Sequence, residues 1–402
     1  MRILQLSPRV PFPLTDGGAL GIFNITKNLA ALGHEVHMVA LSRTGIEETD
    51  ELERSCTLSV VQADTRTTRT GALAALFSRM PYTIKKYWQS QVARRILEIA
   101  TEGKFDLVHA DHLHMARYGQ LVSDELGIPL AIREHNFEST IVERFYQNQR
   151  NPLLRAYGYL EYKKLARYEK NMCGKADLNV MITEEDQSRL RSMDSAVKTV
   201  VVPAGVDIDF FRPARSIPGD GPVPELSILS VASMDWFPNV DAVLWFCDEV
   251  LPKILETHPS AVFQIVGRGV PDAVRAKASD NVKIIGFVDD VRDYMERALV
   301  MVVPLRIGGG MRLKILNALA MAKAVVSTPI GCEGIAVEDG VNISVAEEGA
   351  EFATRVSELL SDAALREKMG GSGLAFVRES HTWPKLIADL ESEYTRLIEG
   401  YR

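Results

Sequence analysis

The chain has 402 residues, of which 46% are hydrophobic and 25% charged, the balance of a globular protein large enough for two domains. A net charge of −7 argues against a general nucleic-acid binder. No apolar run approaches the ~20 residues that span a bilayer, and the N-terminus leads directly into a predicted strand, so we expect a cytoplasmic protein with reduced cysteines.

The first segment predicts a βαβ start. Residues 2–6 form an apolar strand, and a proline-rich stretch, Gly17 and Gly18 lead into a helix with inward-facing residues at helical spacing. A second strand, 35–41, follows Gly33, which indicates a parallel, doubly wound sheet. The dinucleotide pattern G-x-G-x-x-G is absent, and spacing alone leaves open whether Gly17 and Gly18 form a binding loop or a simple turn.

Residues 79–99 combine five cations with Tyr82, Tyr87 and Trp88 in a predicted helical segment. Basic and aromatic side chains together are typical of a helix that lies on a membrane surface or binds an anionic acceptor. The same pattern also fits a solvated helix face beside packed aromatic side chains. Both interpretations remain open at this point.

Two further strands, 106–110 and 129–133, each end in polar residues. The first is followed by His112 and His114, with His109 inside it, and the second by Glu134, His135 and Glu138. Open α/β sheets bind ligands beyond the carboxyl ends of their strands, so these side chains are site candidates. The histidine spacing fits no helical pair of metal ligands, and we expect no metal site.

The composition changes after a long charged helix (151–175) and strands 176–181 and 198–202. Residues 203–224 are rich in proline and glycine, which marks an interdomain connection. We therefore predict domains at 1–204 and 205–382, with an amphipathic helix over 383–402 that packs back on the first domain. Asp207 and Asp209 have the spacing of a metal-binding D-x-D motif, but a linker is the wrong place for one.

The strongest motif lies in the second domain, between predicted strands 300–304 and 324–327. Three glycines, Gly308, Gly309 and Gly310, precede a predicted helix. Arg306, Arg312 and Lys314 lie around the N-terminal end of this helix, which we call its mouth. Free N–H groups and the positive end of the helix dipole bind anions, and basic side chains add charge-assisted hydrogen bonds. We favour a phosphate site over the alternative of a βαβ unit with a basic surface.

The pattern G-G-G-x-R-L-K-I-L-x-A-x-A-M-x-K-x-V-V-S-T-x-x-G-x-E-G, residues 308–334, resembles the donor-binding segment of retaining family 4 glycosyltransferases. The likeness is to the variant found in bacterial exopolysaccharide and cell-surface sugar transferases. It implies the α/β GT-B fold, two Rossmann-like domains whose parallel sheets face each other across a cleft. The usual family pattern has two glutamates eight residues apart. Here those positions are Gly309 and Asn317.

The resemblance implies that a sugar moves from a nucleotide-diphosphate donor to a glycan or lipid-linked acceptor in cell-surface polysaccharide synthesis. It also implies retention of configuration and transfer without a metal or a cofactor. Acceptors of this family are often lipid-linked, so peripheral contact with the inner face of the membrane stays open beside the solvated helix face, and the net charge argues against a nucleic-acid partner. Two alternatives remain: a GT-B nucleotide-sugar epimerase, and a catalytically weak nucleotide-binding partner subunit, which the loss of a glutamate at Asn317 motivates.

The motif and the resemblance together predict the site residues. His135, Arg312 and Lys314 are expected to be catalytic. The donor diphosphate is expected to contact Gly17, Gly18, Arg306, Gly308, Gly309, Gly310, Arg312 and Lys314. The nucleoside is expected at Gly267, Phe287, Val288 and Asn317, and the sugar or acceptor at His109, His112 and Glu333.

Overall fold

The computed structural model describes residues 1–12, 14, 17–45, 49–149, 151–213, 226–308 and 310–401. It divides into two compact units. The N-terminal unit contains Met1–Pro203 together with Trp383–Arg402, and the C-terminal unit contains Ala204–Thr382. The last helix of the chain therefore belongs to the first unit, and Gly309 of the predicted phosphate loop lies outside the described residues.

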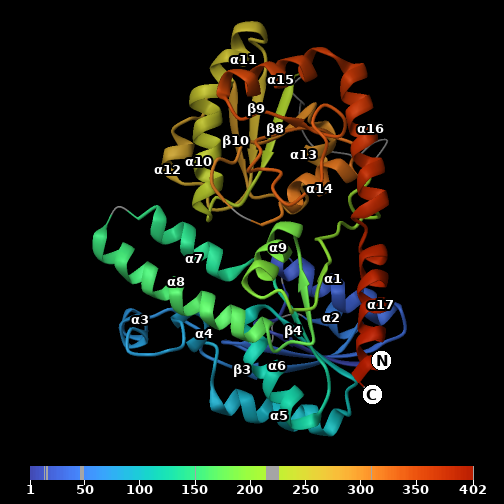
Figure 1. Cartoon of the computed structure of the whole chain (residues 1–402). Helices are drawn as coiled ribbons and strands as arrows, with labels where there is room; N and C mark the ends of the chain where they lie inside the picture. The colour runs from blue at the N-terminus through green and yellow to red at the C-terminus, as the bar shows by residue number, and fades with distance from the viewer. Residues whose placement is uncertain are drawn as a thin grey trace. The chain divides into compact units, whose positions relative to one another are not determined.

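The N-terminal unit is built on a seven-stranded parallel sheet in the order β3-β2-β1-β4-β5-β6-β7. Its central strands β1, β4 and β5 are almost wholly buried because helices cover both faces of the sheet (Figure 1). The strands are β1 (Arg2–Ser7), β2 (Glu35–Ser42), β3 (Thr57–Gln62), β4 (Leu107–Asp111), β5 (Leu130–Arg133), β6 (Leu178–Met181) and β7 (Thr199–Val201).

The helices of this unit have recognisable start signals. The side chain of Asn151 accepts from the first free N–H groups of α8, and Thr183 does the same for α9. The C-terminal α17 packs beside α1 and buries Leu390 and Tyr394 (Figure 1). The helices are α1 (Gly17–Ala31), α2 (Asp50–Glu53), α3 (Arg69–Ala75), α4 (Tyr82–Lys85), α5 (Ser90–Gly103), α6 (Leu113–Leu126), α7 (Glu138–Gln147), α8 (Pro152–Cys173), α9 (Glu184–Met193) and α17 (Trp383–Tyr401).

The segment 79–99 is not one amphipathic helix. It forms α4 and α5 with a break between them, and in that break Tyr87 and Trp88 pack against the core. The indole of Trp88 stacks on Tyr118 with ring centres 4.8 Å apart, and the guanidinium of Arg117 lies 3.8 Å above the indole. For these two aromatic side chains the structure therefore favours the second interpretation, packing against the core.

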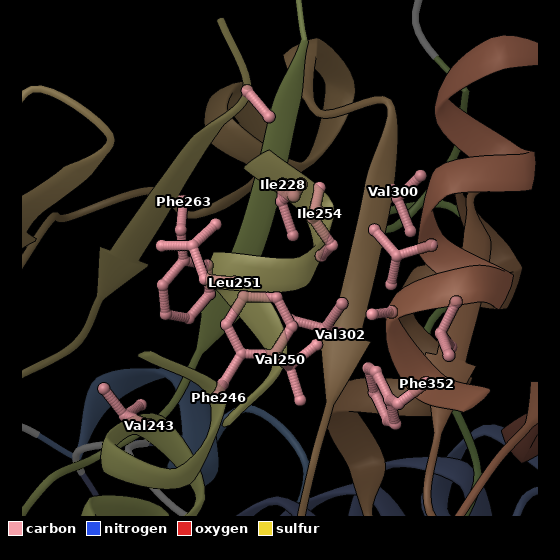
Figure 2. Close-up of a cluster of buried hydrophobic side chains, with 14 of the residues drawn as sticks. Ile228, Val243, Phe246, Val250, Leu251, Ile254, Phe263, Val300, Val302 and Phe352 are labelled. Atoms are coloured by element: carbon pink, nitrogen blue, oxygen red, sulfur yellow. The ribbon is translucent and has the colours of Figure 1, made fainter. Parts of the chain in front are cut away.

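The C-terminal unit is built on a six-stranded parallel sheet in the order β10-β9-β8-β11-β12-β13. Aromatic and branched side chains from the strands and from the helical segments α10, η1, α11 and α15 fill one face, and Phe246, Phe263 and Phe352 are among them (Figure 2). The strands are β8 (Ser227–Val231), β9 (Val262–Val266), β10 (Val282–Gly286), β11 (Val300–Val303), β12 (Ala324–Ser327) and β13 (Ser344–Val345). The helices are α10 (Phe237–Trp245), a π-helical turn η1 (Phe246–Val250), α11 (Leu251–Thr257), α12 (Asp272–Arg275), α13 (Arg292–Arg297), α14 (Leu313–Ala320), α15 (Gly349–Ser361) and α16 (Ala363–Ser380).

Both sheets are doubly wound, and each reverses its strand order beside its first strand. The reversal lies between β1 and β4 in the first unit and between β8 and β11 in the second. Ligands of such sheets bind beyond the carboxyl ends of the strands at this switch point. The loops after these four strands are therefore where a site is expected. In the part of the chain that the structure describes, every helix is too short or too polar to cross a membrane.

Candidate active site

In the loop from β11 to α14, Gly308 and Gly310 have backbone conformations that favour glycine. Gly308 has a φ of 147° and Gly310 a φ of 78°, both in the region that favours glycine. A Cβ added to Gly308 would lie 2.3 Å from Nη2 of Arg312 and 3.1 Å from the ring of Trp236. The loop therefore passes close to a guanidinium and an indole, and it leads directly to the N-terminus of α14.

Lys314, in the first turn of α14, is tied to the first turn of α10 and through it to the loop after β8. Its Nζ donates to Oδ1 of Asn239 over 3.1 Å, and the amide of Asn239 donates in turn to the carbonyl of Ser233 over 2.7 Å. Burial and the charge of Arg312 lower the pKa of Lys314 to about 7. An anion placed here would stabilise the protonated amine and raise that pKa again.

Arg312 is the N-cap residue of α14 and is buried. Its Nη1 donates to the carbonyl of Gly310 over 2.7 Å, and the guanidinium lies 5.2 Å from the ring centre of Trp236. The side chain therefore holds the glycine loop and stacks against the loop after β8. This arrangement fixes a positive charge at the helix mouth.

Arg306 lies at the rim of the same mouth and is 46% exposed at its side chain. It forms a two-point ion pair with Asp241, with Nη2–Oδ1 at 2.6 Å and Nε–Oδ2 at 3.1 Å, and it lies 5.6 Å from the ring centre of Trp245. Contact with a diphosphate, as predicted, requires the guanidinium to share or leave Asp241.

The residues predicted for the nucleoside lie on three different elements. Gly267, with a φ of 154°, directly follows β9, and Ala232 directly follows β8. A Cβ added to Gly267 would lie 1.7 Å from the carbonyl oxygen of Ala232. Phe287 follows β10 and is 67% exposed, whereas Val288 packs against the core. Asn317 is half-buried in α14, and Glu333, predicted for the sugar, is half-buried after β12.

In the N-terminal unit, Gly17 and Gly18 form the first turn of α1. They come after β1, at the switch point of this sheet. Their place agrees with a backbone that approaches a ligand, and it also agrees with a tight entry into the helix. The role predicted for them remains a prediction.

His135 follows β5 and is held by a buried polar network. Its Nε2 lies 2.9 Å from Oδ1 of Asp111 and 2.6 Å from Nη1 of Arg133. Gln5 and Thr26 extend the network: Gln5 donates to Asp111 over 2.7 Å, and Thr26 donates to Gln5 over 2.7 Å. Burial, His112 and Arg133 hold the pKa of His135 well below its ordinary value, so the ring is neutral at pH 7.

Asp111 is the charged centre of this network. Its burial opposes ionisation, but His109 and His135 hold the pKa of the carboxyl well below the usual range. Burial lowers the pKa of Arg133, which is only 1% exposed. The pairing of these two charges fixes the end of β5, and with it the ring of His135.

The structure places His109 in the interior, 1% exposed, which does not agree with contact to a sugar. Its Nδ1 lies 2.5 Å from the hydroxyl of Tyr394 on α17, and its Nε2 lies 3.2 Å from Oδ2 of Asp111. The reason is strand alternation: His109 and Asp111 share a face of β4 and bury their side chains there. We therefore assign His109 to positioning Asp111.

His112, in contrast, lies beside His135. The two rings are stacked, with centroids 3.7 Å apart and planes inclined by 20°. His112 precedes α6 with a φ of 70°, an uncommon value for a residue with a side chain. This strand-end conformation places the two predicted histidines together.

Glu134 and Glu138 do not form an acid–base pair. Glu134 is fully buried, and burial and Glu169 raise its pKa well above the usual range. Glu169 caps α7 by accepting from the N–H of Glu138 over 2.7 Å, and burial raises its pKa to about 8. Both buried carboxyls therefore support the loop that carries His135.

The comparisons with known proteins agree with this geometry. Residues 15–210 match the family model described as Glycosyltransferase Family 4, and residues 225–362 match the model described as Glycosyl transferases group 1. An uncharacterised 44.6 kDa protein of the cps region of Klebsiella pneumoniae is 21% identical over 98% of this chain and 99% of its own. A phosphatidyl-myo-inositol mannosyltransferase of Mycobacterium tuberculosis is 26% identical over 53% of this chain and 58% of its own.

Solved structures share the fold. Sucrose-phosphate synthase of Thermosynechococcus elongatus superimposes with a TM-score of 0.75 at 16% identity, covering 100% of both chains. Anabaena HepE in complex with UDP and glucose gives a TM-score of 0.71 at 17% identity, covering 98% of this chain and 99% of its own. Two doubly wound parallel sheets, a glycine-rich cationic mouth and the matched models together place this chain among the family 4 glycosyltransferases of the GT-B fold.

Proposed function

We propose that this glycosyltransferase uses a nucleotide-diphosphate sugar and binds its diphosphate at the mouth of α14. The observation that carries the proposal is the convergence of Lys314, Arg312, Gly308 and Gly310 with Asn239 and Trp236 at the β8/β11 switch point. Helix N-termini and cationic side chains are the chemistry that recognises phosphate. Anabaena HepE, a structure with this fold, is described with UDP-glucose, which supports a uridine nucleotide as the first donor to try.

The proposed chemistry breaks the anomeric C–O bond while negative charge develops on the leaving diphosphate. Fixed donors that meet such charge lower a barrier by roughly 3–4 kcal/mol each. Lys314, Arg312 and the N–H groups of α14 would supply them, so the transfer would need no metal. We propose that the leaving phosphate oxygen takes the acceptor proton on the same face of the sugar, which gives retention, and that His135 contacts the donor sugar.

We propose a glycan or a lipid-linked glycan as acceptor, in the synthesis of a cell-surface polysaccharide. The uncharacterised relative in the cps region of Klebsiella pneumoniae and the mycobacterial phosphatidyl-myo-inositol mannosyltransferase support this pathway and this acceptor class. The proposed place of action is the cytoplasmic face of the membrane.

Peripheral membrane contact belongs to the same proposal. After α3, Phe77 is 94% exposed, and Leu73 on the helix is 62% exposed, with Lys85 of α4 in the following segment. Exposed apolar side chains beside cations bind anionic lipid surfaces. Co-sedimentation with anionic vesicles should fall when Phe77→Ser is combined with Lys85→Gln. Equal co-sedimentation of the variant and the parent protein would contradict the contact.

The experiment that tests the donor proposal is a thermal-shift screen across nucleotide-diphosphate sugars, because a ligand of the folded state raises apparent stability. The hit is then incubated with acceptor extracts in EDTA, and the anomeric configuration of the product is read by NMR. Retained configuration in EDTA is the expected result. An inverted product, or transfer that is abolished by EDTA and restored by a metal, would contradict the mechanism.

A second candidate is a nucleotide-binding subunit with weak turnover, which Asn317 favours because an amide lacks the charge of the usual glutamate. In that case Asn317→Glu would raise turnover, while the parent protein binds nucleotide without transferring sugar to any acceptor. Conversion of the donor in the absence of an acceptor would favour the nucleotide-sugar epimerase instead.

A further inference from the structure

We propose that His112, His114 and Glu138 form a binding site for a divalent transition-metal ion of the Zn²⁺ class in the N-terminal unit. One ligand atom of each side chain lies within 4.8 Å of those of the other two. The Nδ1 atom of His112 faces Oε1 of Glu138 across 3.9 Å, which is too long for a hydrogen bond. Among the described residues, this buried Nδ1 atom has no hydrogen-bond partner.

The backbone holds these three residues in place. The N–H of His112 donates to the carbonyl of Arg133 over 2.8 Å, which ties the start of α6 to the end of β5. His114 is the second residue of α6, and its ring packs against Tyr87 with ring centres 4.6 Å apart. Glu138 is the first residue of α7, and its N–H is bound by Glu169. Two adjacent strand ends therefore present the three ligands to one point.

The ligand chemistry selects the kind of ion. Two imidazoles with one carboxylate are a donor set for Zn²⁺, whereas Mg²⁺ and Ca²⁺ prefer oxygen ligands alone. Zinc lies about 2.0–2.2 Å from nitrogen and oxygen ligands, so the three atoms would have to move to roughly 3.4 Å from one another. Three protein ligands leave a fourth position for water or a bound molecule.

The proposed metal site lies next to His135, so a bound ion would affect this predicted catalytic residue. His112 stacks on His135, so an ion on His112 would fix the pair of rings and join the starts of α6 and α7. The effect on transfer rests on the role proposed for His135, but binding of the ion does not. The ion is not needed for leaving-group departure at Lys314 and Arg312, which belong to the other unit.

The test is a titration of the metal-free, tag-free full-length protein with Co²⁺, followed by its visible d–d absorption, and a Zn²⁺ competition against a chromophoric chelator. We expect one equivalent of tight binding and Co²⁺ bands of a four-coordinate site. Glu138→Gln and His114→Gln should each weaken Zn²⁺ binding 10-fold or more. His258→Gln, the same change at a histidine of the C-terminal unit, should leave it unchanged.

Circular dichroism and the thermal shift with UDP-glucose are measured on each variant, so that a folding defect or a failed donor site is seen separately. Glu138→Gln keeps the size of the side chain and tests the site even where His114→Gln disturbs the packing on Tyr87. Binding of Zn²⁺ that is equal in the parent protein and in Glu138→Gln, or the absence of a stoichiometric step, would overturn the proposal.

Discussion

Nζ of Lys314 lies 3.1 Å from Oδ1 of Asn239, and this hydrogen bond joins the first turn of α14 to the first turn of α10. The two segments flank the switch point of the C-terminal sheet. The amine of Lys314 is removed from most of its water, has a neutral amide as its partner and lies near the charge of Arg312, which together lower its pKa to about 7. A bound diphosphate would supply the missing negative charge.

Removal of this amine should therefore weaken donor binding strongly. Lys314→Met keeps the aliphatic stem and is expected to lower transfer about 100-fold or more, the usual effect of losing one donor to a developing oxyanion. Calorimetry with UDP-glucose and initial-rate measurements check this. Lys368→Met, at an exposed lysine of α16, is the control and should behave like the parent protein. Near-parental rates for Lys314→Met would refute the phosphate assignment.

The lowered pKa of Lys314 predicts a pH dependence of donor affinity. The free amine loses its proton above about pH 7, whereas a bound diphosphate raises its pKa, so binding above pH 7 must take up a proton. The affinity for UDP-glucose should be constant below pH 7 and fall by up to about tenfold per unit above it. The diphosphate of UDP-glucose keeps its charge over this range. In Lys314→Met the decline should disappear, and a decline of equal slope would contradict the explanation.

Gly308→Ala should abolish donor binding while the protein stays folded. The added Cβ would lie 2.3 Å from Nη2 of Arg312, so the guanidinium would be displaced from the mouth. The positive φ adds a strain of about 1–2 kcal/mol. Gly340→Ala is the matched control, because Gly340 also has a positive φ but nothing within 4 Å of the added Cβ. Thermal melts and calorimetry separate the two effects. Equal donor affinity in both variants would contradict the claim that donor binding requires the close contact between Gly308 and Arg312.

Asp111→Asn should destabilise the N-terminal unit by about 3–5 kcal/mol, because it leaves the buried guanidinium of Arg133 without its charged partner. Urea denaturation followed by tryptophan fluorescence measures this, with Asp64→Asn, at an exposed ion pair with Arg66, as the control that should leave the midpoint unchanged. A change of similar size in both variants would show that the buried network has no special role.

Local pattern was enough to predict much of this protein. The alternation of apolar strands and helices predicted two doubly wound units, which the sheet orders confirm. The loop and helix from Gly308 to Lys314 were found because a strand, glycines and cations follow one another within a few residues. Asn317 was recognised as a departure from the family pattern for the same reason.

Contacts between distant segments could not be predicted in this way. Trp236, Asn239 and Asp241 lie more than 60 residues before the cations that they contact, and only the neighbouring positions of β8 and β11 bring them together. Asp111 was not among the predicted site residues, although it is the buried centre of the network around His135. The interior place of His109 depends on α17, which comes from the far end of the chain.

The central claim, a diphosphate held at the mouth of α14, is tested most directly by a crystal structure of the protein with UDP. The account predicts both phosphates beyond the carboxyl end of β11, within hydrogen-bond distance of Nζ of Lys314 and of the Gly310 backbone, with Arg306 drawn away from Asp241. A nucleotide bound at any other place, with the bond between Lys314 and Asn239 and the pair between Arg306 and Asp241 unchanged, would contradict it.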